Sequence, residues 1–190
     1  YDNYLDDYVY TDSINTVTAL NVSNKSIFDL TGIEDFTALI DLDCRSNQLT
    51  TLDVSQNTAL TYLDCYNNQL TTLDVSQNTA LNYLLCRDNQ LTSLDVSQNT
   101  ALTDLYCPDN QLTSLDLSQN TALTHFYCHD NQLTTLDVRN GNNTNITLFD
   151  ATNNPNLICI SVDDPVWSTA NWNNDIDTLS NLETLTYVMT

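Results

Sequence analysis

Positive charge is scarce in this chain of 190 residues. Four Lys and Arg stand against 25 Asp and Glu, which gives a formal net charge of −21. Binding to nucleic acid needs clustered cations that displace counterions from phosphates, and the same sign argument disfavours anionic membrane surfaces. The composition therefore excludes a nucleic-acid-binding protein.

Long apolar runs and the usual turn residues are also scarce. No stretch approaches the roughly 18 consecutive apolar residues of a membrane span, so we expect no membrane insertion. No signal peptide opens the chain, so we expect an exported protein to be present in its mature form. With only 2 Gly and 3 Pro, another residue type must occupy the turns.

What the sequence has in abundance is a repeat of 21 residues. Two neighbouring copies, at 60–80 and 81–101, read LTYLDCYNNQLTTLDVSQNTA and LNYLLCRDNQLTSLDVSQNTA. The other copies are 39–59, 102–122 and 123–145, the last with two extra residues near Gly141, and looser copies begin at Val17 and Ile146.

Each copy contains the pattern L-x-x-L-x-C-x-x-N-x-L, as at Leu60, Leu63, Cys65, Asn68 and Leu70. This pattern resembles the leucine-rich repeat, with Cys in place of the third Leu. The segment around Cys65 alternates like a short strand, and stacked coils would align such strands in a parallel sheet. The second half of each copy is too short for a full helix. We predict a mostly β, α/β-type solenoid of about seven coils: a right-handed leucine-rich repeat superhelix with one parallel concave sheet and short 3₁₀ or extended convex segments.

A more specific resemblance rests on DLTGIEDFTAL near the start, NQLTTLDVSQNTAL in the middle, and NPNLICISVDD followed by WSTANW. These segments, spread over about residues 17–173, resemble the leucine-rich repeat surface proteins of Bacteroidetes, particularly marine flavobacteria, which are related to internalin-type repeats. The resemblance implies a protein at the outer cell surface or outside the cell.

We divide the chain into an N-terminal cap at 1–16, the solenoid at 17–162 and a C-terminal cap at 163–190, because the open ends of a solenoid core need covering. The aromatic and aliphatic residues expected to seal the N-terminal side are Phe28, Ile33 and Phe36, and those for the C-terminal side are Trp167 and Trp172.

Asparagine recurs at two turn positions of the repeat. Its side chain bonds neighbouring backbone groups in turns, so we expect it to satisfy loop amides and to replace glycine there. One column consists of Asn47, Asn68, Asn89, Asn110 and Asn131, and the other of Asn57, Asn78, Asn99 and Asn120.

Cysteine recurs where the pattern requires a core residue. We expect a column of small buried hydrophobic side chains, inert through burial, rather than a metal or redox ladder. Disulfides between in-register neighbours would be strained, and we expect no cofactor. The column consists of Cys44, Cys65, Cys86, Cys107 and Cys128, and Cys159 stands outside it.

Aspartate forms a column on the predicted convex wall: Asp53, Asp74, Asp95, Asp116 and Asp137. Like charges about 5 Å apart repel by about 1 kcal/mol even in water. We expect hydrogen bonds from hydroxyls or loop amides to offset this, because calcium sites usually gather several oxygens from one loop. A bound cation is the alternative, as it is at the acidic run Asp2, Asp6 and Asp7. We therefore predict no metal site.

His125, His129 and Asp130 lie near Cys128 and raise the question of a hydrolase. Cys128 should point into the core, and the two histidines would be roughly 13 Å apart on a straight strand. A Cys–His pair needs hydrogen-bond reach. Since no nucleotide-binding or G-x-S-x-G motif is present either, we predict no catalytic residues and no enzyme.

The exposed strand positions vary between repeats, whereas the scaffold positions are nearly identical. Tyrosine is frequent at the variable positions, and its broad ring with a hydrogen-bonding tip suits recognition. Cross-strand pairing of exposed aromatics is the purely structural alternative. The predicted ligand-binding residues are Arg45, Tyr62, Tyr66, Tyr83, Leu85, Arg87, Tyr106, His125, Tyr127 and His129.

From these features we expect a non-catalytic binding module, monomeric, at the cell surface or outside the cell. Its partner would be an extracellular protein, peptide or polysaccharide held on the concave Tyr-rich sheet. Two alternatives stay open: a structural spacer or adhesin stalk, and binding of ice or another ordered surface through convex hydroxyls. Those hydroxyls belong to Thr50–Thr51, Thr71–Thr72, Thr92–Ser93, Thr113–Ser114 and Thr134–Thr135.

Overall fold

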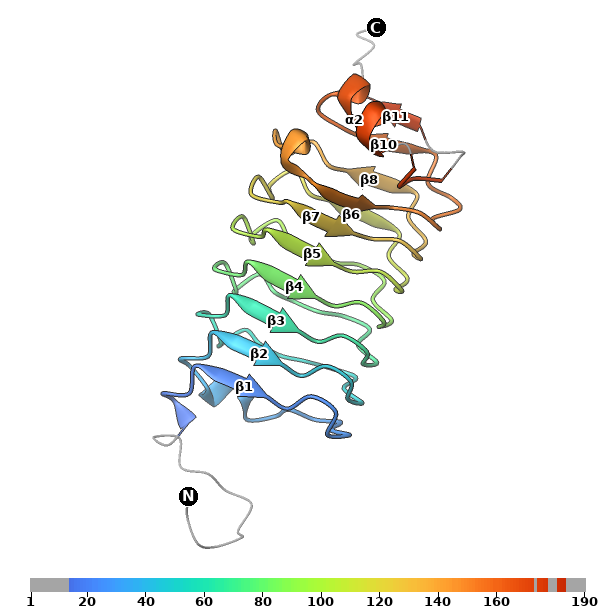
Figure 1. Cartoon of the computed structure of the whole chain (residues 1–190). Helices are drawn as coiled ribbons and strands as arrows, with labels where there is room; N and C mark the ends of the chain where they lie inside the picture. Colours follow the sequence, from blue (N-terminus) through green and yellow to red (C-terminus); the bar gives the residue numbers. More distant parts are fainter. Residues whose placement is uncertain (1–13, 173, 178–180, 184–190) are drawn as a thin grey trace, which may run out of the picture.

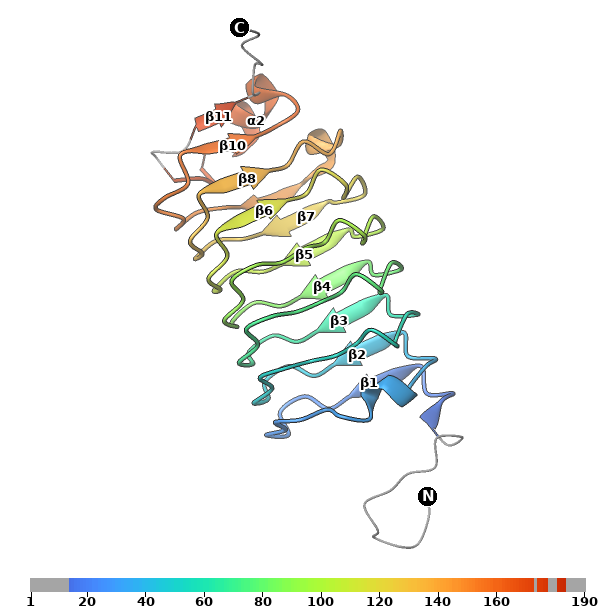
Figure 2. The ribbon, with the colours of Figure 1, turned by 180° about the vertical axis from the view of Figure 1, so that it is seen from behind.

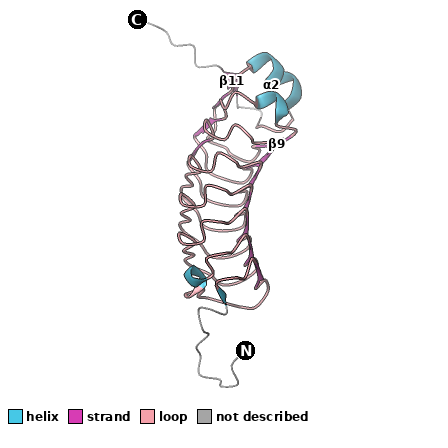
Figure 3. Cartoon of the chain, turned by 90° about the vertical axis from the view of Figure 1, so that its left-hand side faces the viewer, coloured by secondary structure: helices cyan, strands magenta, loops and turns pink. Residues whose placement is uncertain are grey.

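Each 21-residue repeat forms one coil of a solenoid, and successive coils stack along a single axis (Figure 1). The structure is a computed structural model, and it describes residues 14–172, 174–177 and 181–183. In profile the stack is gently curved, with the strands of one wall along its inner side (Figure 3). Modest curvature follows because neither wall carries long helices that would splay the coils apart.

One wall is a parallel sheet of seven three-residue strands, one per coil, in the order β1-β2-β3-β4-β5-β7-β9. Equivalent positions of successive repeats pair in register, so Tyr62 faces Tyr83 and Asp104 faces His125. The strands are β1 (Ala19–Asn21), β2 (Asp41–Asp43), β3 (Tyr62–Asp64), β4 (Tyr83–Leu85), β5 (Asp104–Tyr106), β7 (His125–Tyr127) and β9 (Leu148–Asp150).

The opposite wall contains a second parallel sheet, with the order β11-β10-β8-β6, which is visible from behind in Figure 2. The predicted single concave sheet and extended convex segments are confirmed, and the convex segments also pair with one another, which the prediction did not include. The extended convex segments approach closely enough to pair in the later coils, and an isolated bridge joins Asp53 and Asp74 in the earlier ones. These strands are β6 (Ser114–Asp116), β8 (Thr135–Asp137), β10 (Cys159–Ser161) and β11 (Asn181–Glu183).

The core is a continuous column of leucine, cysteine and valine between the two walls. In one coil Leu60, Leu63, Cys65, Leu70 and Val75 are all completely buried. The five cysteines of the predicted column are likewise buried, and burial raises the pKa of the Cys86 thiol to about 12. The burial confirms the predicted column of core cysteines, and a thiol whose pKa is raised in this way stays protonated at neutral pH.

The asparagine column beside the concave sheet hydrogen-bonds the backbone of its own coil and of the preceding one. Asn89 Nδ2 donates to the carbonyls of Cys65 and Cys86 at 3.0 and 3.1 Å. Its Oδ1 accepts the Leu70 N–H at 3.0 Å. These bonds satisfy backbone groups that stacking removes from water, which confirms that asparagine serves the turns of this chain.

The second asparagine column is only half satisfied. Asn99 Nδ2 donates to the carbonyls of Val75 and Asn78, both at 2.9 Å. Its Oδ1 is buried and has no hydrogen-bond partner, and the same holds for the other three members of this column. Both columns therefore hydrogen-bond the backbone of neighbouring coils, but only in the first column do the side-chain oxygens also have partners.

Short helices and aromatic side chains lie at the two ends of the described stack. At the start, 3₁₀ helix η1 (Ile33–Asp35) buries Ile33. Phe28, however, is 70% exposed, so the expectation that it seals this end was wrong: Ile27 and Leu30 of the same segment pack against the core, and the Phe28 side chain between them is exposed to solvent.

At the other end, helix α2 (Pro165–Trp172) covers the last coils. The buried Trp172 ring stacks on Phe149 at a centroid distance of 4.3 Å, and Trp167 packs edge-on against Trp172. A second 3₁₀ helix, η2 (Asn143–Asn145), occupies the coil with the two extra residues. Most of the predicted N-terminal cap, including Asp2, Asp6 and Asp7, lies outside the described residues, and the proposed boundaries of the caps stay predictions. Within the described residues, no helix has the length and apolarity needed to cross a bilayer.

Candidate functional site

The concave sheet presents three columns of outward side chains, one at each alternate position of the repeat. Because the strands pair in register, each column runs straight across the coils. The inner positions between them, such as Leu63 and Leu84, are fully buried. The predicted ligand-binding residues therefore share one face, and the exposed sheet forms the candidate site.

Four of the tyrosines form two cross-strand pairs. The rings of Tyr62 and Tyr83 are 6.1 Å apart and tilted by 39°. The rings of Tyr106 and Tyr127 are stacked at 5.0 Å with an interplanar angle of 26°. Burial is the main cause that raises the pKa of both Tyr62 and Tyr106, so these phenols stay protonated donors at neutral pH.

The two pairs occupy different columns, and together with their neighbours they cross the sheet obliquely. Tyr62 and Tyr83 lie in the first column, on β3 and β4. Leu85, Tyr106 and Tyr127 continue in the second column, on β4, β5 and β7. His129 follows in the third, edge-on to Tyr127 at 6.2 Å. We call these six residues the diagonal band.

Charged side chains flank the band. Arg45 Nη1 lies 3.3 Å from Asp64 Oδ2, and Arg45 Nε lies 3.7 Å from Asp43 Oδ1. The Asp64 carboxylate is almost fully buried, and its desolvation raises its pKa. Arg45 therefore neutralises charge on the sheet rather than projecting freely towards a ligand.

The two predicted residues Tyr66 and Arg87 meet on neighbouring coils. The Arg87 guanidinium lies over the Tyr66 ring, 4.0 Å from its centroid. Such a cation–π contact holds both side chains against the sheet surface. Ring and guanidinium plane thus form a second flat element beside the diagonal band.

Each histidine is paired with an aspartate of an adjacent coil. His125 Nδ1 lies 2.7 Å from Oδ1 of the buried Asp104. His129 Nδ1 lies 3.2 Å from Asp150 Oδ2. Cys128 is completely buried between the two walls, so the three residues do not assemble the nucleophile and base of a hydrolase.

Sequence reasoning missed Asp104 and Asp150 as partners of the histidines, and it missed Asp109 as a neighbour of His129 and Asp130. The signal was available in the period, because Asp109 precedes Asp130 by 21 residues and occupies the same turn of the preceding coil. The histidine–aspartate pairs follow less directly from the 21-residue period, because each side chain must also rotate towards the neighbouring coil.

The convex wall has a different chemistry. Each aspartate of its column accepts the backbone N–H two residues ahead, as Asp95 Oδ1 does from Ser97 at 2.9 Å. This confirms the predicted hydrogen bonding, which lowers the pKa of Asp53, Asp74 and Asp95. Two surface hollows of about 780 and 630 Å³ lie on this wall, lined by its Ser, Thr and Asp residues.

Comparisons with known proteins show which folds this architecture is similar to. No protein-family model matches the chain. A segment of 51 residues is 49% identical to Internalin J of Listeria monocytogenes, and it covers 27% of this chain and 6% of that protein. A leucine-rich repeat protein of Leptospira interrogans is 26% identical in structure-based alignment, with a TM-score of 0.57, over 83% of this chain and 40% of that chain.

The chain therefore spans less than half the length of either protein. Internalin C2 of L. monocytogenes is 21% identical with a TM-score of 0.65, and the alignment covers 92% of this chain and 82% of that one. The assignment to Bacteroidetes stays a prediction. The repeat, the parallel strands and these likenesses together show that this chain has an internalin-like leucine-rich repeat fold.

Proposed function

We propose that the chain is a non-catalytic binding module that holds an extended peptide or polysaccharide segment of an extracellular partner along the diagonal band. The observation that carries this proposal is the pair of tyrosine stacks, Tyr62–Tyr83 and Tyr106–Tyr127, on an otherwise polar sheet. Tyrosine rings contribute large contact areas at low cost in side-chain entropy, and their hydroxyls add hydrogen bonds.

The shape of the band favours a linear ligand. Three strand spacings separate β3 from β7, and four residues along the strand separate the first column from His129. At about 4.8 Å per strand and 3.3 Å per residue, the band is about 20 Å long. That length accommodates about six residues of an extended peptide, or a short run of sugar rings stacked on the tyrosines.

The scaffold beneath the band is preorganised. The inward residues under the rings are completely buried leucines and, on β7, the completely buried Phe126, and asparagine bonds tie neighbouring coils together. A rigid surface loses little entropy on binding, which favours affinity at a given contact area. The surrounding aspartates and the net charge of −21 favour neutral or cationic ligands over anionic ones.

The proposal extends to location and assembly: a monomer acting at the cell surface or outside the cell. The likeness to internalins supports this location. On the described part of the concave face, the side chains do not converge into a catalytic group, which supports a binding role. A spacer or stalk without a ligand is the alternative, and it predicts that the tyrosines can be removed without consequence for binding.

The test screens the purified chain on a glycan array and against a panel of extended peptides. We then compare the wild type with a variant in which Tyr62, Tyr83, Tyr106 and Tyr127 are changed to Ser. The variant should lose binding while keeping its circular dichroism spectrum, because the buried leucine and cysteine columns are untouched. A matched control carries four changes on the convex wall, Thr51, Thr72, Thr113 and Thr134 to Ala, and should bind like the wild type. Equal binding by the tyrosine variant contradicts the proposal.

A further inference from the structure

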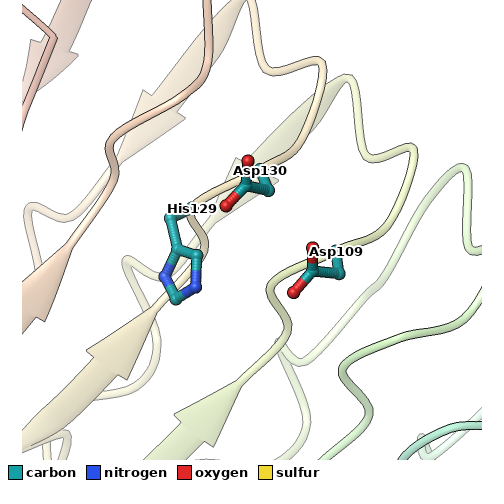
Figure 4. A group of neighbouring side chains, drawn as sticks. All are labelled: Asp109, His129 and Asp130. Carbon is teal, nitrogen blue, oxygen red and sulfur yellow. The ribbon is translucent and has the colours of Figure 1, made fainter.

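At His129, the last residue of the diagonal band, and at the turns that follow this position in two neighbouring coils, three side chains with metal-binding atoms come together (Figure 4). Asp109, His129 and Asp130 each contribute one nitrogen or oxygen atom, and these atoms all lie within 4.8 Å of one another. Asp109 and Asp130 are exposed and His129 is partly buried, so an ion could reach them from solvent.

The backbone holds the two carboxylates one coil apart. Asp109 and Asp130 have φ angles of 53° and 54°, at the turn position that other coils fill with Ser46, Asn67, Asp88 or Asn153. The turns are stacked by main-chain hydrogen bonds: the Asp109 N–H donates to the His129 carbonyl at 3.2 Å, and the Asp130 N–H to the Thr152 carbonyl at 3.1 Å. The same pattern of main-chain hydrogen bonds between coils that forms the sheet therefore also fixes the backbone of this cluster.

A second, independent observation concerns the orientation of the imidazole. His129 Nδ1 is buried and lies 3.2 Å from Asp150 Oδ2 on the next coil, close but not aligned as a hydrogen bond. Figure 4 shows the other ring nitrogen on the side of Asp109. In metal-binding histidines one ring nitrogen donates a hydrogen bond to a carboxylate while the other binds the ion, and here the Asp150 carboxylate lies within reach of that bond while the other nitrogen is on the side of Asp109.

The neighbouring coils show why such a cluster occurs once among the described residues. The position of His129 is taken by Arg45, Tyr66, Arg87 and Pro108 in the preceding coils and by Thr152 in the following one. Next to Asp88 stands the cation Arg87, whereas Asp109 and Asp130 have a neutral neighbour in Pro108 and an imidazole in His129. Asp88 borders the group, and burial followed by the charge of Asp109 raises its pKa.

From this geometry we propose a surface site for a divalent transition-metal ion, with Zn²⁺ as its principal occupant. Imidazole nitrogen favours Zn²⁺, and the two carboxylates supply the remaining protein ligands. Three protein ligands leave a coordination position for water or for a group of the bound partner. Ca²⁺ is a poorer match, because it prefers six to eight oxygens.

Binding would require only small movements. Metal–ligand distances of about 2.0–2.2 Å place tetrahedral ligand atoms about 3.4 Å apart. Rotation of two exposed aspartate side chains about their χ angles closes the present separations. The inference does not rest on the proposed function, although the site lies beside Tyr127, at the end of the diagonal band.

The experiment titrates the purified chain with Zn²⁺, and in parallel with Ca²⁺ and Mg²⁺, by isothermal calorimetry. The chain has two histidines, so imidazole NMR resolves them individually. We expect one Zn²⁺ per chain, a shift of the His129 ring signals, unchanged His125 signals, and no comparable binding of Ca²⁺ or Mg²⁺. A shift of His125 alone, or equal binding of Ca²⁺, overturns the proposal.

Matched variants use residues that the chain itself places at the same positions. Asp109→Asn and Asp130→Asn copy Asn67 and Asn153 and keep the turn, while each should lower Zn²⁺ affinity at least tenfold. His129→Thr copies Thr152 and should abolish binding, whereas His125→Gln should leave it unchanged. Wild-type affinity in His129→Thr shows that the ion binds elsewhere and overturns the proposal.

Two further variants test the orienting carboxylate and the thiol nearest the C-terminal end. Asp150→Asn should lower the affinity about tenfold and shift the tautomer balance of His129 in the metal-free chain, a change that a merely structural role would not produce. Cys159→Ser should bind Zn²⁺ like the wild type, because no thiol takes part. Loss of binding in Cys159→Ser contradicts the ligand assignment.

Discussion

On the concave wall the exposed side chains change from coil to coil, whereas on the convex wall Thr or Ser and Asp recur at the same two positions. Both walls are products of one repeat and both contain parallel strands. The convex positions interact mainly within their own turn, as Asp95 does with Ser97. The concave positions interact across coils, as Tyr106 does with Tyr127.

This difference means that the convex wall can be copied with little adjustment, since its exposed aspartates are satisfied within their own turns. A change on the concave wall alters a contact with the next coil. Variation there therefore changes the surface in patches of two coils, such as a tyrosine stack or a histidine–aspartate pair. The predictions below test this contrast, beginning with the largest expected effect.

The asparagine columns offer the strongest contrast in stability. Asn89→Ala leaves the Leu70 N–H without its side-chain acceptor and removes one of the two asparagine donors to the carbonyls of Cys65 and Cys86, and it should lower the free energy of unfolding by about 3 kcal/mol. Asn99→Ala removes the side-chain donor from the Val75 and Asn78 carbonyls, which each keep a backbone N–H donor, and it also removes a buried oxygen without a partner. It should cost less, about 1–2 kcal/mol. Urea unfolding of both variants measures the difference, and equal losses would contradict the contrast.

The tyrosine stack should show coupling between coils. A double-mutant cycle of Tyr106→Ala and Tyr127→Ala should give a coupling energy of about 1 kcal/mol, because the stacked rings interact beyond the area that they bury. The matched cycle on the convex wall uses Thr113→Ala and Thr134→Ala. The Thr134 hydroxyl bonds the backbone carbonyl of residue 113, which Thr113→Ala retains, so coupling there should be near zero. Thermal unfolding of the wild type and the variants of both cycles checks the two values.

The aspartates of the two walls should differ in their pH dependence. Burial raises the pKa of Asp64, so its charged form destabilises the fold, and that penalty disappears as the pH falls through its raised folded pKa. Hydrogen bonds lower the pKa of Asp95, so its stabilising contribution is present above the unfolded pKa of about 3.9 and is lost as the pH falls through the lower folded value.

At pH 7, Asp64→Asn should therefore leave the free energy of unfolding unchanged or slightly raised. Asp95→Asn should lower it by less than about 1 kcal/mol, since that carboxylate is exposed to solvent. Both effects should become smaller at about pH 3, where the carboxyl groups of the unfolded chain are largely protonated. Denaturant titrations at the two pH values measure them. A lower free energy of unfolding for Asp64→Asn together with a higher one for Asp95→Asn at pH 7 would show that burial and hydrogen bonding do not govern these two groups.

The period alone predicted most of the scaffold. Leu, Cys and Asn at fixed spacing determine which side chains face inward and which columns form, and the register of the concave sheet follows. The second sheet was not predictable in this way. Its pairing depends on how closely the convex segments approach, and in the early coils it is reduced to the bridge between Asp53 and Asp74. The prediction for Phe28 was wrong because hydrophobicity alone does not tell which side chains of an irregular segment face the core.

The site was predicted as a set of columns but not as a set of contacts. The columns place Tyr62 beside Tyr83 because coils stack in register. They do not tell that Arg45 turns to Asp64, or that His129 turns to Asp150, because side-chain rotation decides those pairs. The diagonal course of the band and the approach of Asp109 to His129 likewise emerged only in three dimensions.

The near-identity of the middle coils also gives the chain an adjustable length. A duplication of residues 60–80 would insert a coil whose two surfaces match the neighbours on either side, because every stacking contact recurs after 21 residues. The ends would move apart by about 4.8 Å with no new interface to optimise. Unequal exchange between repeats could thus lengthen or shorten the protein in whole coils and shift the spacing of its recognition elements while the fold stays intact.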